Sequence, residues 1–141
     1  MSQENVEVVR RGIDAFNAFM RGELSSQAYA QTFDPQIEMV WPDRRTYPDF
    51  PQRLDGVSEV IAFSEQYRDE WVDLTQEPVD LIQAPGDRVL ALIRQSASGR
   101  QSGVPIVIHF FEVVTFRDGR ICRVAYFRHR ADAERAAGLS E

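Results

Sequence analysis

Apolar residues near the start of the chain recur at helical spacing. Five of them are separated by three, four, three and four positions: Val6, Val9, Ile13, Phe16 and Met20. This spacing places them on one side of an α-helix and predicts a helix over about residues 2–22. A second, shorter helix is expected after Ser25 or Ser26, where it buries Tyr29 and Phe33.

A strand and a loop follow this helical region. Asp34 and Pro35 predict a turn. Residues 37–41 then alternate so that three large apolar side chains share one face: Ile37, Met39 and Trp41. Residues 42–56 carry three prolines and no periodicity, which predicts a loop. Loops of this length often form the mouth or lid of a site.

The second half of the chain predicts a helix and then a run of strands. Residues 57–71 return to helical spacing, with Asp55 as the expected N-cap. Alternating residues then predict four strands, over about residues 74–83, 88–97, 104–117 and 120–128. A last helix is expected over residues 130–137, ended by Gly138. This order indicates an α+β fold in one domain over residues 1–141, with the sheet curled around the helices.

The segment HFFEVVTFRDGRICRVAYF, residues 109–127, predicts a β-hairpin with one carboxylate among apolar residues. Its turn can be a two-residue Asp-Gly loop or a three-residue loop with Gly119 in the left-handed region. The choice decides which side chains share a face, because a slip of one residue turns a strand over. We favour the three-residue loop because it gives one nearly apolar face: Ile108, Phe110, Glu112, Val114, Phe116, Cys122, Val124, Tyr126 and Arg128.

The opposite face of the hairpin then carries a mixed set of polar side chains: His109, Thr115, Arg123 and His129. The same face, away from the helices, also receives apolar residues: Val107, Phe111, Val113, Ile121 and Phe127. An apolar stripe of this size is unusual on the surface of a monomer. It therefore predicts a homodimer.

Glu112 allows two interpretations. If it has no cationic partner, desolvation raises its pKa and makes it an acid or hydrogen-bond donor near neutral pH. If it pairs with an arginine such as Arg94 or Arg128, it is a structural buried ion. The sequence leaves both interpretations open.

Composition and charge exclude several classes of function. The net charge is −6, and the basic residues are scattered, which argues against nucleic-acid binding. Cys122 is the single cysteine, and the two histidines fall on the outward face, so no metal site is expected. The polar N-terminus and the lack of a run of ~18 apolar residues indicate no membrane partner and a cytoplasmic location.

Four stretches carry a resemblance to a known family: FDPQIEMVW, GDRVLALIR, FEVVTFRDGRICRV and DAERAAGL. Over essentially its whole length the chain resembles the SnoaL-like members of the nuclear transport factor 2-like superfamily, relatives of ketosteroid isomerase and polyketide cyclases. The resemblance implies a conical barrel, in which a strongly bent antiparallel sheet wraps three helices and leaves a cavity at the open end. It also implies that a homodimer through the sheet is common.

The residues of the enzymes in this superfamily transfer only in part. In ketosteroid isomerase, a carboxylate base lies near the end of the first strand, and that position falls here on Trp41. The position of its protonated acid falls on Glu112, while its helix-one tyrosine falls near residues 12–16, where no hydroxyl occurs. The acid that cyclases carry late on the final strand is missing from residues 123–127.

Two functional hypotheses remain. The first is an isomerase-, cyclase- or dehydratase-like enzyme for a small apolar carbonyl compound, with Glu112 as acid, Tyr126 or Tyr67 assisting and Asp43 as a base. Its pocket would include Trp41, Phe63, Tyr67, Phe110 and Val124. The second is a ligand-binding or dimerisation module of the same fold without catalysis. Neither hypothesis requires a cofactor.

Overall fold

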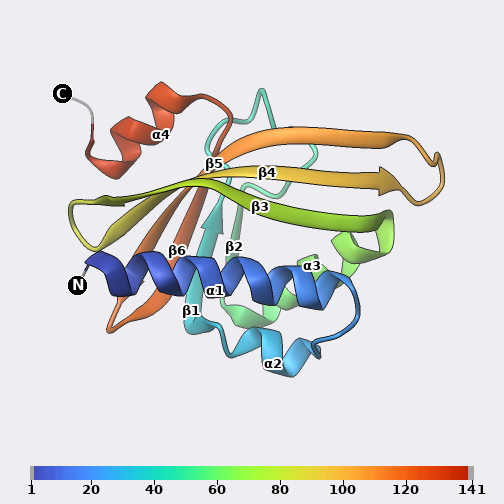
Figure 1. Cartoon of the computed structure of the whole chain (residues 1–141), viewed down its shortest axis with the longest axis horizontal. Helices are drawn as coiled ribbons and strands as arrows, with labels where there is room; N and C mark the ends of the chain where they lie inside the picture. Colours follow the sequence, from blue (N-terminus) through green and yellow to red (C-terminus); the bar gives the residue numbers. More distant parts are fainter. Residues whose placement is uncertain (1, 140–141) are drawn as a thin grey trace.

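The computed structural model describes residues 2–139, which form four helices and six strands (Figure 1). The helices are α1 (Ser2–Met20), α2 (Ser26–Ala30), α3 (Val57–Glu70) and α4 (Arg130–Ala137). The strands are β1 (Phe33–Val40), β2 (Arg53–Asp55), β3 (Trp71–Ala84), β4 (Arg88–Gly99), β5 (Pro105–Arg117) and β6 (Arg120–Phe127). The predicted helices and the four C-terminal strands are confirmed to within a few residues. Strand β2 lies inside the segment predicted to be a loop.

The six strands of the described residues form one sheet in the order β2-β1-β6-β5-β4-β3. Strands β3 to β6 pair antiparallel in succession, as the sequence predicts. Strand β1 instead pairs parallel with β6 and antiparallel with β2. The sheet is therefore mixed, and the prediction of a wholly antiparallel sheet is wrong at this edge. A parallel neighbour needs a long crossover connection, and the chain from β2 to β5 supplies it.

Helices α1, α2 and α3 lie on one side of the bent sheet, and α4 lies on the other (Figure 1). Val9 and Ile13 of the predicted helical stripe are buried in the inner core with Phe19 and Tyr29. This arrangement confirms the predicted α+β cone, in which the inner face of the sheet wraps three helices.

The outer apolar stripe is covered by α4. Ala133 and Ala137 are completely buried against a second core that contains Phe111, Val113 and Phe127. Alanine lets a helix approach a sheet closely, so this short helix seals the stripe. The surface that led us to predict a homodimer is therefore largely occupied by the chain itself, and Val107, 52% exposed, is the predicted member that stays open.

The β5–β6 hairpin differs from the prediction at its turn. Arg117 pairs with Arg120 across a two-residue loop, in which Asp118 and Gly119 have φ of 54° and 76°. Two successive positive φ values are typical of a type I′ turn. The predicted three-residue loop is therefore wrong.

A β-bulge restores the predicted alternation farther along the hairpin. Phe116 pairs with Ile121 and Thr115 with Arg123, so Cys122 is an extra residue between the two pairs. Beyond it, Glu112 pairs with Tyr126, and both share the inner face with Val124. The face of Glu112 is confirmed, whereas Ile121, which we had placed outside, is buried in the inner core.

Strand β1 begins earlier than predicted. It starts at Phe33, so Asp34 and Pro35 lie in the strand rather than in a separate turn. The register to β6 shifts between Phe33 and Glu38, and the Asp34 carboxylate accepts a hydrogen bond of 2.8 Å from the backbone N–H of Gln36. Proline lacks an N–H and is tolerated at such an irregularity.

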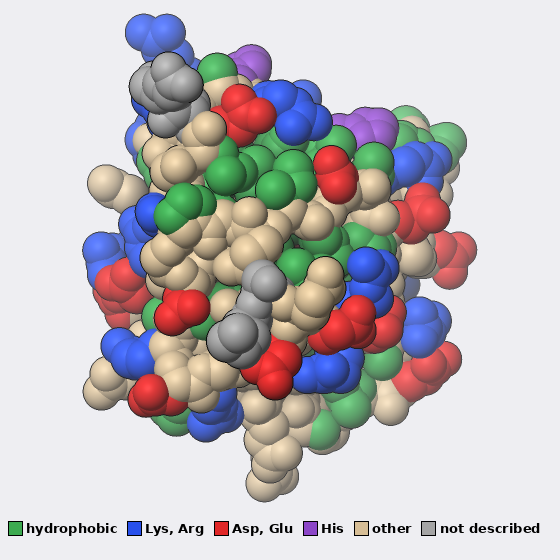
Figure 2. Space-filling view, turned by 60° about the vertical axis from the view of Figure 1, so that its left-hand side comes forward, with side chains coloured by type: hydrophobic (Ala, Val, Ile, Leu, Met, Phe, Trp, Pro, Cys, Tyr) green, Lys and Arg blue, Asp and Glu red, His purple; other side chains and the backbone are tan. Residues whose placement is uncertain are grey.

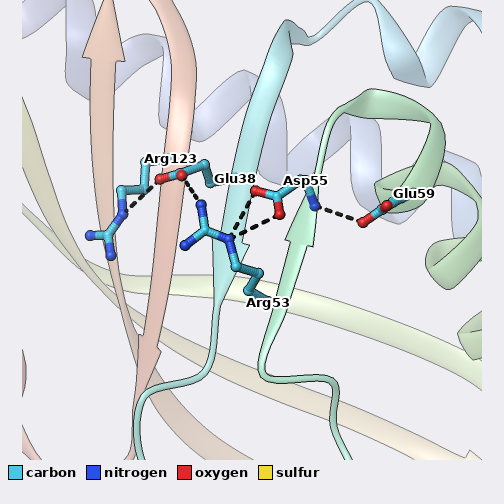
Figure 3. Close-up of polar contacts among 5 residues, drawn as sticks. All are labelled: Glu38, Arg53, Asp55, Glu59 and Arg123. Atoms are coloured by element: carbon cyan, nitrogen blue, oxygen red, sulfur yellow. Dashed lines mark hydrogen bonds and ion pairs between the residues drawn. The ribbon is translucent and has the colours of Figure 1, made fainter.

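Charged side chains join β6, β1 and β2 on the outer face (Figure 3). The Glu38 carboxylate accepts hydrogen bonds from Arg53 and, at 3.2 Å, from Arg123. The Asp55 side chain accepts a hydrogen bond from Arg53, and its backbone N–H donates one of 2.8 Å to the Glu59 carboxylate. The prediction that Asp55 caps α3 is therefore wrong, because Gly56 is the N-cap and makes no side-chain hydrogen bond.

The surface carries both signs of charge. Figure 2 shows acidic and basic side chains interspersed over one face of the molecule. No helix within residues 2–139 combines the length and apolar character that crossing a membrane requires. In the same part of the chain, no three His, Cys, Asp or Glu side chains are grouped so that they could hold a metal ion.

Candidate functional site

A cavity of about 130 Å³ lies between the inner face of the sheet and the helices. Its floor is formed by inward residues of β4, β5 and β6, and α1 and α3 contribute to its walls. Seven of the eight predicted site residues line it: Trp41, Phe63, Tyr67, Phe110, Glu112, Val124 and Tyr126. Strand alternation places Phe110 and Glu112 of β5 and Val124 and Tyr126 of β6 on one face. Phe63 and Tyr67 come from α3, and Trp41 follows β1.

Aromatic rings form much of the cavity wall. Trp41 stacks on Tyr126 with ring centroids 4.7 Å apart and planes at 8°. Phe63 stacks on Tyr67 at 5.9 Å. Flat walls of this kind suit a planar apolar ligand.

Two further aromatic residues, Tyr47 and Phe50, reach the cavity from the segment between β1 and β2. Phe50 contacts both Trp41 and Phe63, with centroids at 5.5 and 6.0 Å. Sequence reasoning identified this segment as a possible mouth but did not select its aromatic residues. The available signal was their position among three prolines in an otherwise polar loop.

Glu112 opens to the cavity without a charged partner. Residues 2–139 provide it with no hydrogen bond and no ion pair, and Arg94 is bound to Glu77 at 2.9 Å instead. Desolvation by burial raises the pKa of Glu112 from its ordinary value of 4.5 to about 7. The described residues therefore give no support to the structural ion-pair interpretation.

Three tyrosines lie within the electrostatic influence of Glu112. Burial raises the pKa of Tyr29 and Tyr126, and the negative charge of Glu112 adds to this effect. Burial also raises the pKa of Tyr47, to about 12. All three hydroxyls therefore keep their protons near neutral pH and can donate hydrogen bonds. The hydroxyl of Tyr126 lies 3.5 Å from the sulfur of Met39, a weak acceptor.

Asp43, the predicted base, is placed differently from the other site residues. Its carboxylate accepts hydrogen bonds from the Thr46 hydroxyl at 2.5 Å and from the Arg45 backbone N–H at 3.1 Å. These bonds, led by the one from Thr46, lower the pKa of Asp43. It does not belong to the cavity lining and instead borders a shallow groove next to α4. The side chain is used to build its own turn.

The cavity has a second polar region, formed by Tyr67 and two glutamines. Gln95 donates a hydrogen bond of 3.0 Å to the Tyr67 hydroxyl and accepts one of 2.9 Å from Gln76. Sequence reasoning missed both glutamines. The signal for Gln95 was present, because this amide occupies an inward position in the alternating strand RVLALIRQ.

The comparisons with known proteins agree with this geometry. A model of the SnoaL-like domain family matches residues 9–124, most of the chain. The chain belongs to the SnoaL-like family. No curated protein matches it.

Solved structures share the fold of this SnoaL-like chain at low identity. A provisionally named isomerase from Bacillus subtilis is 18% identical, with a TM-score of 0.73 over 98% of this chain and 95% of that one. A provisionally named SnoaL-like polyketide cyclase from Jannaschia sp. CCS1 is 19% identical, with a TM-score of 0.73 over 100% and 95%. TerC, co-crystallised with polyporic acid, is 18% identical, with a TM-score of 0.70 over 97% and 99%. At these identities the likeness establishes the fold alone.

Proposed function

We propose that this SnoaL-like chain is an enzyme that moves a proton on a small apolar carbonyl compound bound in its cavity. The observation that carries the proposal is the uncompensated carboxyl of Glu112, whose pKa of about 7 leaves both protonation states populated at neutral pH. Such a group can act as a base in one step and as an acid in the next.

The proposed reaction needs a single acid–base group. Ionised Glu112 removes a proton from the carbon next to the carbonyl, and the electron pair moves onto the carbonyl oxygen. The hydroxyl of Tyr126 donates a hydrogen bond to that oxygen. When the compound has a carbon–carbon double bond at the β,γ position, the anion formed is a dienolate. Protonated Glu112 returns the proton to its γ carbon, and the double bond moves into conjugation with the carbonyl, so atoms and electrons balance. Among the described lining residues, Glu112 is the one carboxylate, and no histidine or basic side chain accompanies it.

The size and walls of the cavity support a compact ligand. The cavity holds about 130 Å³, and its lining is mostly apolar and aromatic, as is usual for small-molecule sites. Isomerase and cyclase names among the structural neighbours, and the polyporic acid of TerC, support a small-molecule role for the same fold.

Exchange of carbon-bound protons tests the proposal without knowledge of the natural substrate. With 2-tetralone in D₂O at pH 7, NMR should show that the wild type accelerates deuterium incorporation next to the carbonyl. Glu112→Gln should lower the acceleration about a hundredfold or more, whereas Asp80→Asn on the exposed part of β3 serves as a matched carboxylate control. The wild-type rate should rise with pH up to about 7 and then level off, because the base is ionised Glu112.

Equal exchange in the wild type and Glu112→Gln would contradict the proposal. Saturable binding of 2-tetralone without any exchange would instead favour the second hypothesis, a ligand-binding module without catalysis. Trp41 favours that hypothesis to some extent, since it stands where ketosteroid isomerase would have its base and is stacked on Tyr126.

A homodimer also remains a proposal, but its apolar contact surface is smaller than the sequence predicts, because α4 covers most of the outer stripe. Val104, Ile106 and Val107 at the start of β5 are 54%, 38% and 52% exposed. Neighbouring strand residues point to opposite faces, so each face of the β4–β5 hairpin end carries an exposed apolar side chain. Light scattering at micromolar concentration should give about twice the 16.2 kDa of one chain, and Val107→Lys should lower that mass. A wild-type mass near 16.2 kDa would contradict the proposal.

A further inference from the structure

The second polar region of the cavity, formed by Tyr67, Gln76 and Gln95, is held in place by hydrogen bonds to α1. The side chain of Asn17 donates a hydrogen bond of 2.9 Å to the backbone carbonyl of Gln76 and accepts one of 2.8 Å from its backbone N–H. This pair fixes β3 against α1. From Gln76 the side-chain hydrogen bonds continue through Gln95 to the hydroxyl of Tyr67.

The direction of these bonds leaves one proton unused. Gln95 donates to the Tyr67 oxygen, so the hydroxyl hydrogen of Tyr67 does not serve this bond. The described residues offer no acceptor for it. Burial raises the pKa of Tyr67, so the hydroxyl keeps this proton. Because Tyr67 lines the cavity, its hydroxyl can donate to an oxygen of a bound ligand.

The two polar regions lie at opposite ends of an apolar floor. On β4 the inward residues run from Ala91 through Ile93 to Gln95, and on β5 their partners are Glu112, Phe110 and Ile108. Four residues of strand separate the Glu112 position from the Gln95 position, or about 13 Å along the backbone. A ligand between them meets a carboxyl, then apolar and aromatic surface, and then the Tyr67 hydroxyl.

We propose that Tyr67, positioned by Gln95, is a specificity-determining hydrogen-bond donor that selects ligands with a second acceptor oxygen. The expected class is a planar apolar compound with a carbonyl at the Glu112 end and an ether, carbonyl or hydroxyl oxygen at the far end. This inference rests on the proposed function, because it takes the carbonyl to lie beside Glu112.

A matched pair of ligands tests the donor. The 6-methoxy and 6-ethyl derivatives of 2-tetralone are similar in shape, and the methoxy oxygen can accept but cannot donate a hydrogen bond. Affinities from quenching of tryptophan fluorescence should favour the methoxy compound in the wild type by about fivefold, the usual worth of one neutral hydrogen bond. Tyr67→Phe should reduce this preference to about one while the 6-ethyl compound still binds.

Gln95→Leu provides a second variant and tests the positioning role. It keeps the Tyr67 hydroxyl but removes its support, so the preference for the methoxy compound should fall without disappearing. The ratio of the two affinities is the readout, because a merely structural loss weakens both ligands alike.

Retention of the preference in Tyr67→Phe, or its absence in the wild type, would overturn the inference. If neither compound binds to the wild type, the inference fails, and deuterium exchange on unsubstituted 2-tetralone decides the proposed function separately. If the preference follows Tyr67 but deuterium exchange is absent, the donor stands and the proposed proton transfer alone fails.

Discussion

Two glutamates on the same sheet have opposite surroundings. Glu38 lies on the outer face of β1, where Arg53 and Arg123 bind its carboxylate (Figure 3). Glu112 lies on the inner face of β5 with no cation among the described residues. The same side chain is a structural ion in one place and a proton-carrying group in the other. The environment, rather than the residue type, sets the chemistry.

The largest difference between Glu112 and Glu38 should appear in how each affects the pH dependence of the free energy of unfolding. The pKa of Glu112 is about 7 in the folded protein and near 4.5 in the unfolded chain. Between these values the folded state binds more protons, so stability falls as the pH rises. The total loss by pH 8 should be about 3 kcal/mol at most.

Glu112→Gln should remove this loss. Chemical denaturation at pH 5 and pH 8 should show that the variant gains stability relative to wild type between the two pH values. The amide keeps the volume and strands no arginine, so the variant should also fold normally at pH 5. A variant that is strongly destabilised at both pH values would show that Glu112 is an ion-paired structural residue after all.

A smaller effect is expected for Glu38→Gln. The side chains of the two arginines are 50% and 44% exposed and regain water when the carboxylate is lost. The variant should lose no more than about 1 kcal/mol, and 1 M salt should shrink that difference because exposed pairs are screened. A loss as large as the Glu112 effect, or one insensitive to salt, would show that the two sites differ less than their surroundings suggest.

Local patterns predicted the parts of this fold that depend on neighbouring residues. The helices followed from the 3.6-residue period, and the position of Glu112 inside followed from alternation along β5. The partner of β1 could not be found in this way, because its parallel pairing with β6 joins segments more than 80 residues apart. The covering of Phe111 by α4 is equally non-local, since the sequence shows an apolar face but not what packs on it.

The candidate site was predictable to a similar extent. Large inward side chains such as Trp41 and Tyr126 stood out as apolar positions of strands. Asp43 was selected as a base because it is a carboxylate two residues beyond Trp41, the position of the base in ketosteroid isomerase. Its carboxylate instead accepts hydrogen bonds within its own turn, and it is not part of the cavity lining. The hydrogen-bonded chain Gln76–Gln95–Tyr67 joins β3, β4 and α3, so no single stretch of sequence could predict it.

The unpaired residue Cys122 reverses the alternation of inward and outward side chains within β6. Before Cys122 the odd-numbered Ile121 faces the cavity, whereas after it the even-numbered Val124 and Tyr126 do. If Cys122 were instead paired with Thr115 in the ladder, every later residue of β6 would move by one position, and Ala125 would replace Tyr126 on the cavity side. The bulge at Cys122 therefore keeps Tyr126 opposite Glu112. The side chains of β6 that line the cavity are thus decided by where the strand leaves a residue unpaired as well as by its sequence.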